Sequence, residues 1–236
     1  MGGIIGYIGD KQSQPILVNS LKRLEYRGCD SCGIAVLGDK VSICKDIGKV
    51  SNLESRLEPL TGKVGNGHTR LATHGEPSQV NAHPHCDCTG NIAVVHNGVI
   101  NNFQSLRQQL ISEGHTFISE TDTEVIPHLI EKYYNGSLEK AVEAALRVVE
   151  GSYAIVVVMV GEPKLVAARK DSPLIIGIGD RENFIASDVP AILDYTDRVI
   201  YLEDGDIGVV TKDNIKIKRE GTEVSREEHR ILWSIE

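Results

Sequence analysis

The sequence contains no long apolar run and no excess of basic residues, and each absence excludes a class of protein. Its longest uninterrupted apolar stretch, residues 154–160, is far shorter than the about 20 residues of a membrane-spanning helix. The first residues also lack the basic segment and apolar stretch of a signal peptide. Lysine and arginine number 25 against 33 aspartates and glutamates, a net charge of -8, which disfavours nucleic acid and anionic membranes as partners. We therefore expect a cytoplasmic protein that binds neither nucleic acid nor membrane.

A disulfide framework is not expected either. The chain has five cysteines, an odd number, and no signal peptide, which fits a reducing compartment. Cys29 and Cys32 form a CxxC pair, and residues 83–88 (HPHCDC) offer four potential metal ligands. A zinc site in that segment is one interpretation, but the spacings match no paired zinc-knuckle pattern. We expect small buried thiols and no metal site.

What the sequence does contain is enough apolar surface for one large domain. Of its 236 residues, 41% are hydrophobic and 25% are charged, as in ordinary globular domains. Strands are predicted over residues 3–8, 33–37, 41–44, 64–68 and 92–96, and helices from Ser13 to about Gly28, from Asn101 or Asn102 to Gly114, after a capping box at 121–124, and over 138–149. Residues 68–92 lack periodicity and are predicted to form a functional loop. From residue 152 onward, strands rich in β-branched residues indicate burial on both faces.

Four segments carry a more specific signal. They are residues 68–75 (HTRLATHG), 81–85 (NAHPH), 95–98 (VHNG) and 121–124 (TDTE). Together they resemble the glutaminase domain of the glucosamine-6-phosphate synthase family, one of the class II, N-terminal-nucleophile glutamine amidotransferases. Residues 168–174 (ARKDSPL) and 183–188 (NFIASD) favour this family over the related phosphoribosylpyrophosphate amidotransferases, which are the alternative. The resemblance implies an α+β fold, a four-layer αββα sandwich, over residues 1–222, with residues 223–236 starting a linker to isomerase domains that the chain lacks.

The second position departs from that family. Its members begin Met-Cys-Gly-Ile and lose the methionine, so the exposed cysteine supplies both the thiol nucleophile and the amine that activates it. Here Gly2 stands in place of that cysteine. Because glycine has no side chain to attack an amide carbon, we expect a domain that binds glutamine without hydrolysing it, with engineering as the favoured origin of the change. The alternatives are a natural glutamine sensor or scaffold subunit, and a domain in which Cys29 or Cys32 replaces the thiol.

The resemblance also implies which residues bind L-glutamine and its product L-glutamate. Arg70, supported by Thr73 and the His74 backbone, pairs with the α-carboxylate, a role that suits a planar guanidinium. Asp122 binds the α-ammonium group. Without the surrounding motifs, Arg70 would indicate a salt bridge and Asp122 a helix cap.

The implied oxyanion hole consists of the Asn97 side-chain amide and the Gly98 backbone N–H, and Gly98 also contacts the substrate. Losing one such donor typically costs about 3 to 4 kcal/mol of transition-state stabilisation. Taken alone, an Asn-Gly pair more often marks a hairpin turn. By analogy, Arg27 helps to arrange the residue at position 2. Leu71 replaces the tryptophan that usually follows the motif arginine, which leaves the gating role of that tryptophan in doubt here.

The resemblance implies no metal and no organic cofactor, since acyl transfer in this class uses only protein groups. His83, His85 and His96 are accordingly predicted to shape the loop through hydrogen bonds. In the intact parent, glutamine and fructose 6-phosphate become glutamate and glucosamine 6-phosphate, with ammonia passing internally to the isomerase domain. That parent is expected to be a homodimer.

Overall fold

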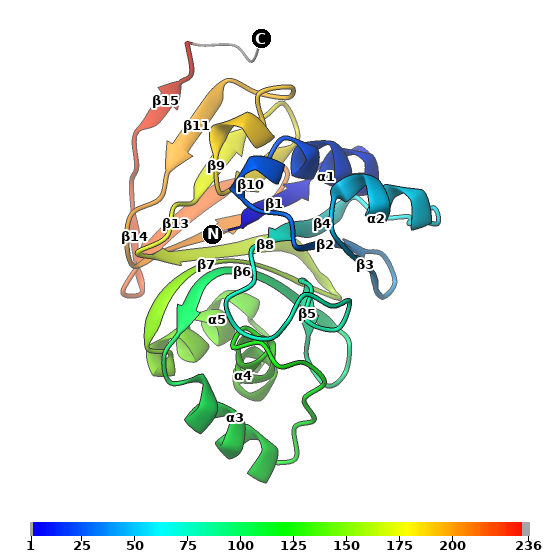
Figure 1. Cartoon of the computed structure of the whole chain (residues 1–236). Helices are drawn as coiled ribbons and strands as arrows, with labels where there is room; N and C mark the ends of the chain where they lie inside the picture. Colours follow the sequence, from blue (N-terminus) through cyan, green and yellow to red (C-terminus); the bar gives the residue numbers. More distant parts are fainter. Residues whose placement is uncertain (1, 233–236) are drawn as a thin grey trace.

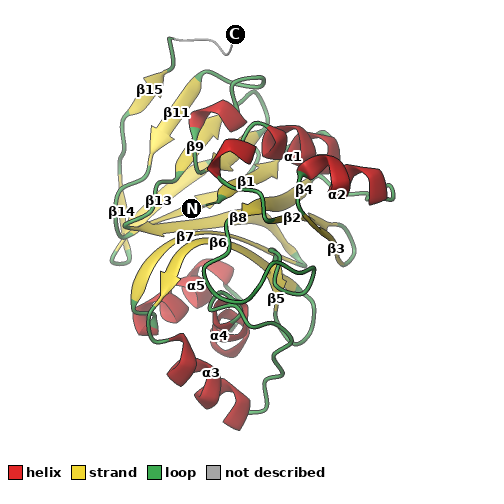
Figure 2. Ribbon diagram, in the orientation of Figure 1, coloured by secondary structure: helices red, strands yellow, loops and turns green. Residues whose placement is uncertain are grey.

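The computed structural model describes residues 2–232, and these form two antiparallel sheets stacked between two layers of helices (Figures 1 and 2). The first sheet contains β1 (Gly3–Ile8), β2 (Ser31–Leu37), β3 (Val41–Ile47), β4 (Val64–Arg70), β9 (Ile175–Ile178), β10 (Asn183–Ala186), β11 (Arg198–Tyr201) and β15 (Glu228–Arg230). Their order in the sheet is β15-β11-β9-β10-β1-β4-β2-β3. The N-terminal strand β1 therefore lies in the interior of this sheet, between β10 and β4.

The second sheet is built from the middle and the end of the chain. It contains β5 (His85–Cys86), β6 (Ile92–Ile100), β7 (Gly151–Met159), β8 (Glu162–Lys170), β12 (Asp206–Val210), β13 (Ile215–Arg219) and β14 (Thr222–Val224), in the order β14-β13-β12-β8-β7-β6-β5. Helices α1 (Ser13–Lys22) and α2 (Val50–Arg56) cover the first sheet, while α3 (Phe103–Ser112), α4 (Val125–Tyr133) and α5 (Leu138–Val148) cover the second (Figure 2). Short 3-10 turns lie at η1 (Glu25–Arg27) and η2 (Val189–Ala191). The predicted four-layer αββα sandwich of the α+β class is confirmed.

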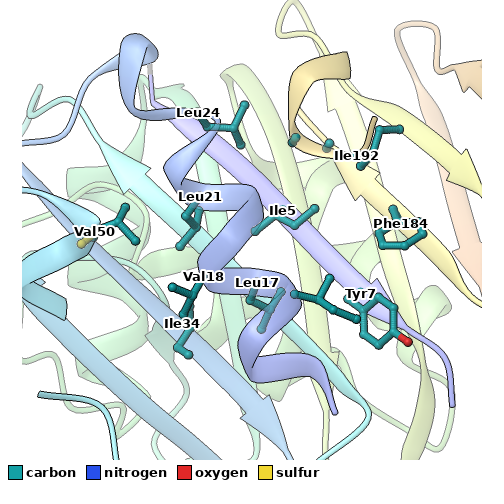
Figure 3. Close-up of a cluster of buried hydrophobic side chains, with 14 of the residues drawn as sticks. Ile5, Tyr7, Leu17, Val18, Leu21, Leu24, Ile34, Val50, Phe184 and Ile192 are labelled. Atoms are coloured by element: carbon teal, nitrogen blue, oxygen red, sulfur yellow. The ribbon is translucent and has the colours of Figure 1, made fainter. Parts of the chain in front are cut away.

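Side-chain alternation along β1 separates two of the three apolar cores. Successive residues of a strand face opposite sides of the sheet. Ile5 and Tyr7 accordingly pack in the core under α1, whereas Ile4 and Ile8 pack in the core between the sheets. Figure 3 shows the first of these cores, with the leucines of α1 lying over the strands. A third core joins the second sheet to α3, α4 and α5.

Helix boundaries differ from the sequence prediction in ways that have local causes. Helix α1 ends at Lys22, and the chain continues through η1 to Gly28, whose φ of +121° suits glycine. Ser13 is the first residue of the helix, as predicted, and donates its hydroxyl to the Gly62 carbonyl. Helix α2 was not predicted, because only Val50 and Leu53 of its seven residues are buried. Two apolar residues in a short segment give no detectable period.

The burial of the C-terminal strands also differs in part from the prediction. Strand β7 is buried on both faces from Tyr153 to Val158, as its β-branched sequence predicts. Strands β11, β12 and β13 instead alternate between buried and partly exposed residues. They lie toward the sheet edges, where one face is only partly covered by helices (Figure 1). Within residues 2–232, no helix is both long and apolar enough to cross a membrane.

Strand pairing continues past residue 222, where the sequence predicts that the domain ends. Residues Thr222–Val224 pair with β13, and Glu228–Arg230 pair with β11 at the edge of the first sheet. Residues 233–236 of the predicted linker lie outside the described part of the chain. The segment that follows residue 222 is thus part of both sheets as far as Arg230.

Candidate functional site

A pocket opens where the start of β1 meets the ends of β4 and β6. Antiparallel pairing sets Gly3 opposite Thr69, so residue 2 lies beside the end of β4. Residues from β4, β6 and the loops that precede β5 and α4 complete the lining. The residues that line the pocket are Gly2, His68, Arg70, Leu71, Thr73, His83, His96, Asn97, Gly98, Thr121, Asp122 and Thr123. Most of the residues singled out in the sequence therefore converge on one place, although they come from segments far apart in the chain.

The carbonyl of Gly2 is held by two side chains. It accepts a hydrogen bond from Asn97 Nδ2 at 2.7 Å and another from Arg27 Nε at 3.1 Å. The Arg27 guanidinium also pairs with Asp188, at 3.3 Å between Nη1 and Oδ2. A Cβ atom built on Gly2 in this conformation would overlap the carbonyl oxygen of Thr69. Any larger residue at position 2 therefore requires a rotation of the backbone there.

His68 fixes the orientation of the Asn97 amide. Its Nε2 lies 2.8 Å from Asn97 Oδ1, and because an amide oxygen only accepts, Nε2 is the donor. The amide NH2 then points toward Gly2. Burial lowers the pKa of His68 to about 3, so the ring is neutral at physiological pH. Sequence reasoning assigned His68 no role, although its position two residues before Arg70 on the same strand places both side chains on one face.

Gly98 occupies a position that only glycine fits. Its φ is +127°, and an added Cβ would overlap the carbonyl oxygen of Ser152 on the neighbouring strand β7. Asn97 and Gly98 pair with Ala154 and Tyr153 within the β6–β7 ladder. The hairpin-turn alternative for this Asn-Gly pair is therefore wrong.

Asp122 supports the strand below the pocket and does not cap a helix. Its Oδ2 accepts from the backbone N–H of Ile100 at 2.8 Å, and its Oδ1 lies 3.9 Å from His74 Nδ1. Helix α4 begins at Val125 without a side-chain cap, so the capping interpretation of Asp122 is wrong. Asp122 as a whole is 3% exposed, and it lines the pocket. One of its oxygens is thus used by the fold while the other faces His74.

Arg70 holds the loop that follows β4. The guanidinium is almost fully buried and donates to the carbonyl oxygens of His74, Gly75 and Glu76. Its partners in this structure are backbone carbonyls, which differs from the salt bridge that an isolated arginine would suggest. Burial lowers the pKa of Arg70, and the nearby Asp122 carboxylate opposes that shift. The arginine and the aspartate assigned to the α-carboxylate and the α-ammonium group of the substrate therefore influence each other electrostatically.

His83, His85 and His96 are buried and neutral. His83 stacks on His68 with ring centroids 4.1 Å apart, and burial lowers the pKa of His83 well below its usual range. The pKa values of His85 and His96 are lowered for the same reason. His85 bonds to Thr121 at 3.1 Å and His96 to Thr123 at 2.8 Å. These contacts tie the loop of residues 121–123 to the strands.

Neither thiol of the CxxC pair reaches the pocket. Cys32 is fully buried in the core under α1, and Cys29 donates to the Gly48 carbonyl at 3.1 Å. Both are absent from the pocket lining, so the alternative in which one of them replaces the missing nucleophile is wrong for this structure. Among the described residues, His83, His85 and Cys86 also do not join Cys88 in a metal-ligand cluster.

Comparison with known families adds an independent observation. A model of the glutamine amidotransferase domain matches residues 68–194, which is more than half of the chain. Among curated relatives, the glutamine--fructose-6-phosphate aminotransferase [isomerizing] of Clostridium tetani is 53% identical over 99% of this chain and 39% of its own length. The enzyme of the same name from Pyrococcus horikoshii is 52% identical over all of this chain and 41% of its own length. The chain spans about two fifths of the length of these relatives.

Solved structures show the same fold. The glutamine phosphoribosylpyrophosphate amidotransferase of B. subtilis, complexed with ADP and GMP, superimposes with a TM-score of 0.81 at 26% identity, over 92% of this chain and 49% of that one. A glutamine aminotransferase class-II domain protein from Silicibacter pomeroyi superimposes with a TM-score of 0.61 at 15% identity, over 92% of this chain and 97% of that one. The second likeness extends to the fold alone.

Proposed function

The chain belongs to the glutamine amidotransferase domain family, and on that premise we propose that the pocket beside Gly2 binds L-glutamine and its product L-glutamate. The observation that carries this proposal is the convergence of Asn97, Gly98 and Asp122 on the point to which β1 delivers residue 2. To bind free glutamine, a site needs an anion for the α-ammonium group, a cation for the α-carboxylate and hydrogen-bond donors for the side-chain amide oxygen. In this proposal the anion is Asp122. The cation is Arg70, supported by Thr73 and His74. The donors are the Asn97 side-chain amide and the Gly98 N–H.

The proposed reaction of an intact family member begins with a thiol at position 2. The thiol attacks the side-chain amide carbon of glutamine, ammonia leaves, and water then hydrolyses the thioester to glutamate. The Asn97 amide and the Gly98 N–H stabilise the oxyanion at each step. Gly2 supplies no thiol, so the proposed state of this chain is glutamine binding without hydrolysis.

Beyond this domain, the names of the relatives support a role in glucosamine 6-phosphate synthesis from fructose 6-phosphate. In that proposal the domain delivers ammonia to an isomerase domain in a homodimeric cytoplasmic enzyme. The relatives at about half identity carry that name, whereas the phosphoribosylpyrophosphate amidotransferase likeness is at 26% identity. A phosphoribosylpyrophosphate-type parent, or a glutamine sensor or scaffold subunit, is the second candidate.

Calorimetric titration of the chain with L-glutamine and L-glutamate tests the binding proposal. The informative variant is Asp122→Asn, because asparagine still accepts from the Ile100 N–H but carries no charge to attract an ammonium group. We expect this variant to weaken binding more than about tenfold, as loss of a charged hydrogen bond of about 1.5 to 3 kcal/mol predicts. Asp46→Asn is the matched control, since Asp46 also accepts a backbone N–H but lies outside the pocket lining. Equal binding by the two variants would contradict the assignment of the pocket.

Restoring the thiol tests the chemistry. Gly2→Cys, prepared with Met1 removed, is expected to release ammonia from glutamine and to form a covalent adduct visible by mass spectrometry. The backbone at residue 2 must rotate to move the new Cβ away from Thr69, and a free amino terminus permits that rotation. Gly2→Ala is the control, because it introduces the same Cβ without the sulfur. A folded Gly2→Cys protein that binds glutamine and stays inert would show that the nucleophile position is misassigned.

A further inference from the structure

Four side chains outside the pocket converge on one point between α4 and the loops next to it. Cys88 lies in the turn between β5 and β6, and His115 follows the end of α3. His128 and Glu131 lie three residues apart on α4, a spacing that places both on one face of a helix. One ligand-type atom from each of the four residues falls within 4.8 Å of the others. None of these residues lines the pocket beside Gly2.

The distances within this cluster match the edges of a tetrahedral metal site. A zinc ion with Zn–N bonds of about 2.0 to 2.1 Å and a Zn–S bond of about 2.3 Å sets its nitrogens about 3.3 Å apart and its sulfur about 3.5 Å from each nitrogen. Between the two histidines, Nδ1 and Nδ1 are 3.3 Å apart. Cys88 Sγ lies 3.4 Å from Nδ1 of His128 and 3.6 Å from Nδ1 of His115.

The Glu131 carboxylate supplies the fourth corner of the tetrahedron. Glu131 Oε2 is 3.1 Å from His115 Nδ1 and 3.5 Å from His128 Nδ1. With Zn–O and Zn–N bonds of about 2.0 to 2.2 Å, a tetrahedral edge between oxygen and nitrogen is about 3.3 Å. Five of the six edges of the tetrahedron are thus close to their expected lengths, and the sixth, between sulfur and carboxylate, lies within 4.8 Å.

Hydrogen bonding alone satisfies this arrangement poorly. Each histidine presents the same nitrogen, Nδ1, to a thiol, to the other histidine and to a carboxylate at once. A single proton on one of these nitrogens serves one neighbour and leaves the others facing lone pairs. A divalent cation at the centre satisfies all four groups together. The set of one sulfur, two imidazole nitrogens and one carboxylate oxygen is typical of zinc ligation.

The groups around the cluster support the four ligands. The backbone N–H of Thr116 donates to Cys88 Sγ at 3.3 Å and so holds the sulfur in place. The second ring nitrogen of the buried His128, Nε2, faces the Glu124 carboxylate at 3.7 Å. A metal-bound histidine typically directs its other nitrogen toward such a carboxylate. Cys88 is exposed, which gives an ion a path to the site.

We propose that Cys88, His115, His128 and Glu131 bind one zinc ion in a closed, structural site. The thiol of Cys88 gives up its proton to solvent when the metal binds. The ion cross-links the β5–β6 turn, the loop after α3, and α4. Glu124, which faces His128, also accepts from the backbone N–H groups of Ile118 and Ser119, so the site braces the loop that leads to Asp122. Sequence reasoning considered the ligands of residues 83–88 together and missed this set, because the partners of Cys88 lie 27 to 43 residues away.

Titration of the chelator-treated full chain with Co²⁺ tests this proposal. Tetrahedral Co²⁺ with a thiolate ligand gives visible d–d bands and a sulfur-to-metal charge-transfer band, and we expect both at one equivalent, with displacement by Zn²⁺. Cys88→Ser is expected to abolish the charge-transfer band. It should also weaken Zn²⁺ binding more than about tenfold, because even outer-shell changes typically weaken metal sites by about 10- to 100-fold.

Two further variants keep the test decisive. Cys86→Ala removes a neighbouring thiol that lies outside the cluster, and it is expected to retain both bands. Glu131→Gln keeps the side-chain size and is expected to weaken Zn²⁺ binding while leaving the charge-transfer band. Zn²⁺ should raise the melting temperature of the unmodified chain and not that of Cys88→Ser. No metal bound by the unmodified chain, or equal binding by Cys88→Ser, would overturn the proposal, and neither result bears on glutamine binding.

Discussion

His68 and Asn97 lie on facing sheets, and their side chains meet in the pocket at 2.8 Å. The neutral imidazole donates to the amide oxygen, and this leaves the amide NH2 directed at the carbonyl of Gly2. A protonated ring would still donate, so the bond by itself does not require neutrality. Burial does, since a charged ring in this position would lose its hydration without gaining a counter-charge.

Buried neutral histidines make the stability of the protein depend on pH. Burial holds the pKa of His68 at about 3, against 6.5 in an unfolded chain. Below pH 6.5 the unfolded state therefore binds more protons than the native state, and the free energy of unfolding falls as the pH decreases. The contribution of a buried neutral histidine to the free energy of unfolding is fully present above pH 6.5. It is lost progressively as the pH falls to about 3, at up to about 1.4 kcal/mol per pH unit for each such histidine.

The variant His68→Gln isolates that contribution. Urea unfolding at pH 5 and pH 6 should show a pH dependence smaller by about 1.4 kcal/mol per unit than in the unmodified chain. Glutamine preserves a donor toward Asn97, so its own cost in stability is separate from the slope. His229→Gln serves as the control, because His229 in β15 is exposed. Identical slopes for His68→Gln and the unmodified chain would show that His68 titrates alike in both states.

At the scale of the element, α1 is the helix that the sequence predicts through its apolar stripe. Leu17 and Leu21 are fully buried between α1 and the first sheet (Figure 3). The stripe was recognisable because its leucines recur at helical spacing. The end of the helix could not be recognised in the same way. Leu24 continues the apolar stripe, but it lies beyond Lys22, in the turn that leads to η1.

Truncation of the stripe should destabilise the whole domain. Leu21→Ala is expected to lower the free energy of unfolding by about 2 to 5 kcal/mol, because it removes a buried side chain and leaves a cavity. Ile111→Ala on α3 is the control, since Ile111 is 51% exposed and its loss should change stability by about 0.5 kcal/mol or less. Both are measured by chemical denaturation with circular dichroism. Similar costs for the two variants would contradict the packing of α1 described here.

At the scale of the whole molecule, one buried asparagine connects the two sheets. Asn66 lies on β4 in the first sheet, and its Nδ2 donates to the carbonyls of Ala93 at 3.1 Å and Val156 at 3.0 Å in the second sheet. The surrounding core between the sheets is otherwise made largely of aliphatic side chains. Hydrophobic packing alone sets few restrictions on how two sheets slide, whereas these two bonds fix their relative position.

Replacing Asn66 should therefore lower the free energy of unfolding by more than the loss of a side chain of its size would suggest. Asn66→Ala is expected to lower the free energy of unfolding by about 3 kcal/mol or more, since two bonds are lost and two buried carbonyls lose a donor. Asn66→Asp should be worse at pH 7 than at pH 4, because a carboxylate would face those carbonyls. Asn91→Ala, at an exposed position, is the control. Equal stability of Asn66→Ala and Asn91→Ala in urea would refute the role of Asn66.

The motifs in the sequence were sufficient to predict the family, the layered fold and six of the residues that line the pocket, namely Gly2, Arg70, Thr73, Asn97, Gly98 and Asp122. The order of residues within a single segment was also enough to predict helices α1 and α5, through their apolar periodicity, and strand β7, through its continuous run of β-branched residues. The absent side chain at position 2 was equally a property of the sequence.

Only the tertiary structure decided which residues meet. The stacking of β4 against β6 brought His68 to Asn97, whereas the packing of α4 and its neighbouring loops against β5 and β6 brought Asp122 to the Ile100 N–H and Cys88 to the face of α4. These contacts join residues separated by 22 to 40 positions, and no local pattern encodes such a distance. They arise because the strands and helices bury their apolar faces against one another in three cores, and this layering brings polar groups from distant segments of the chain into contact.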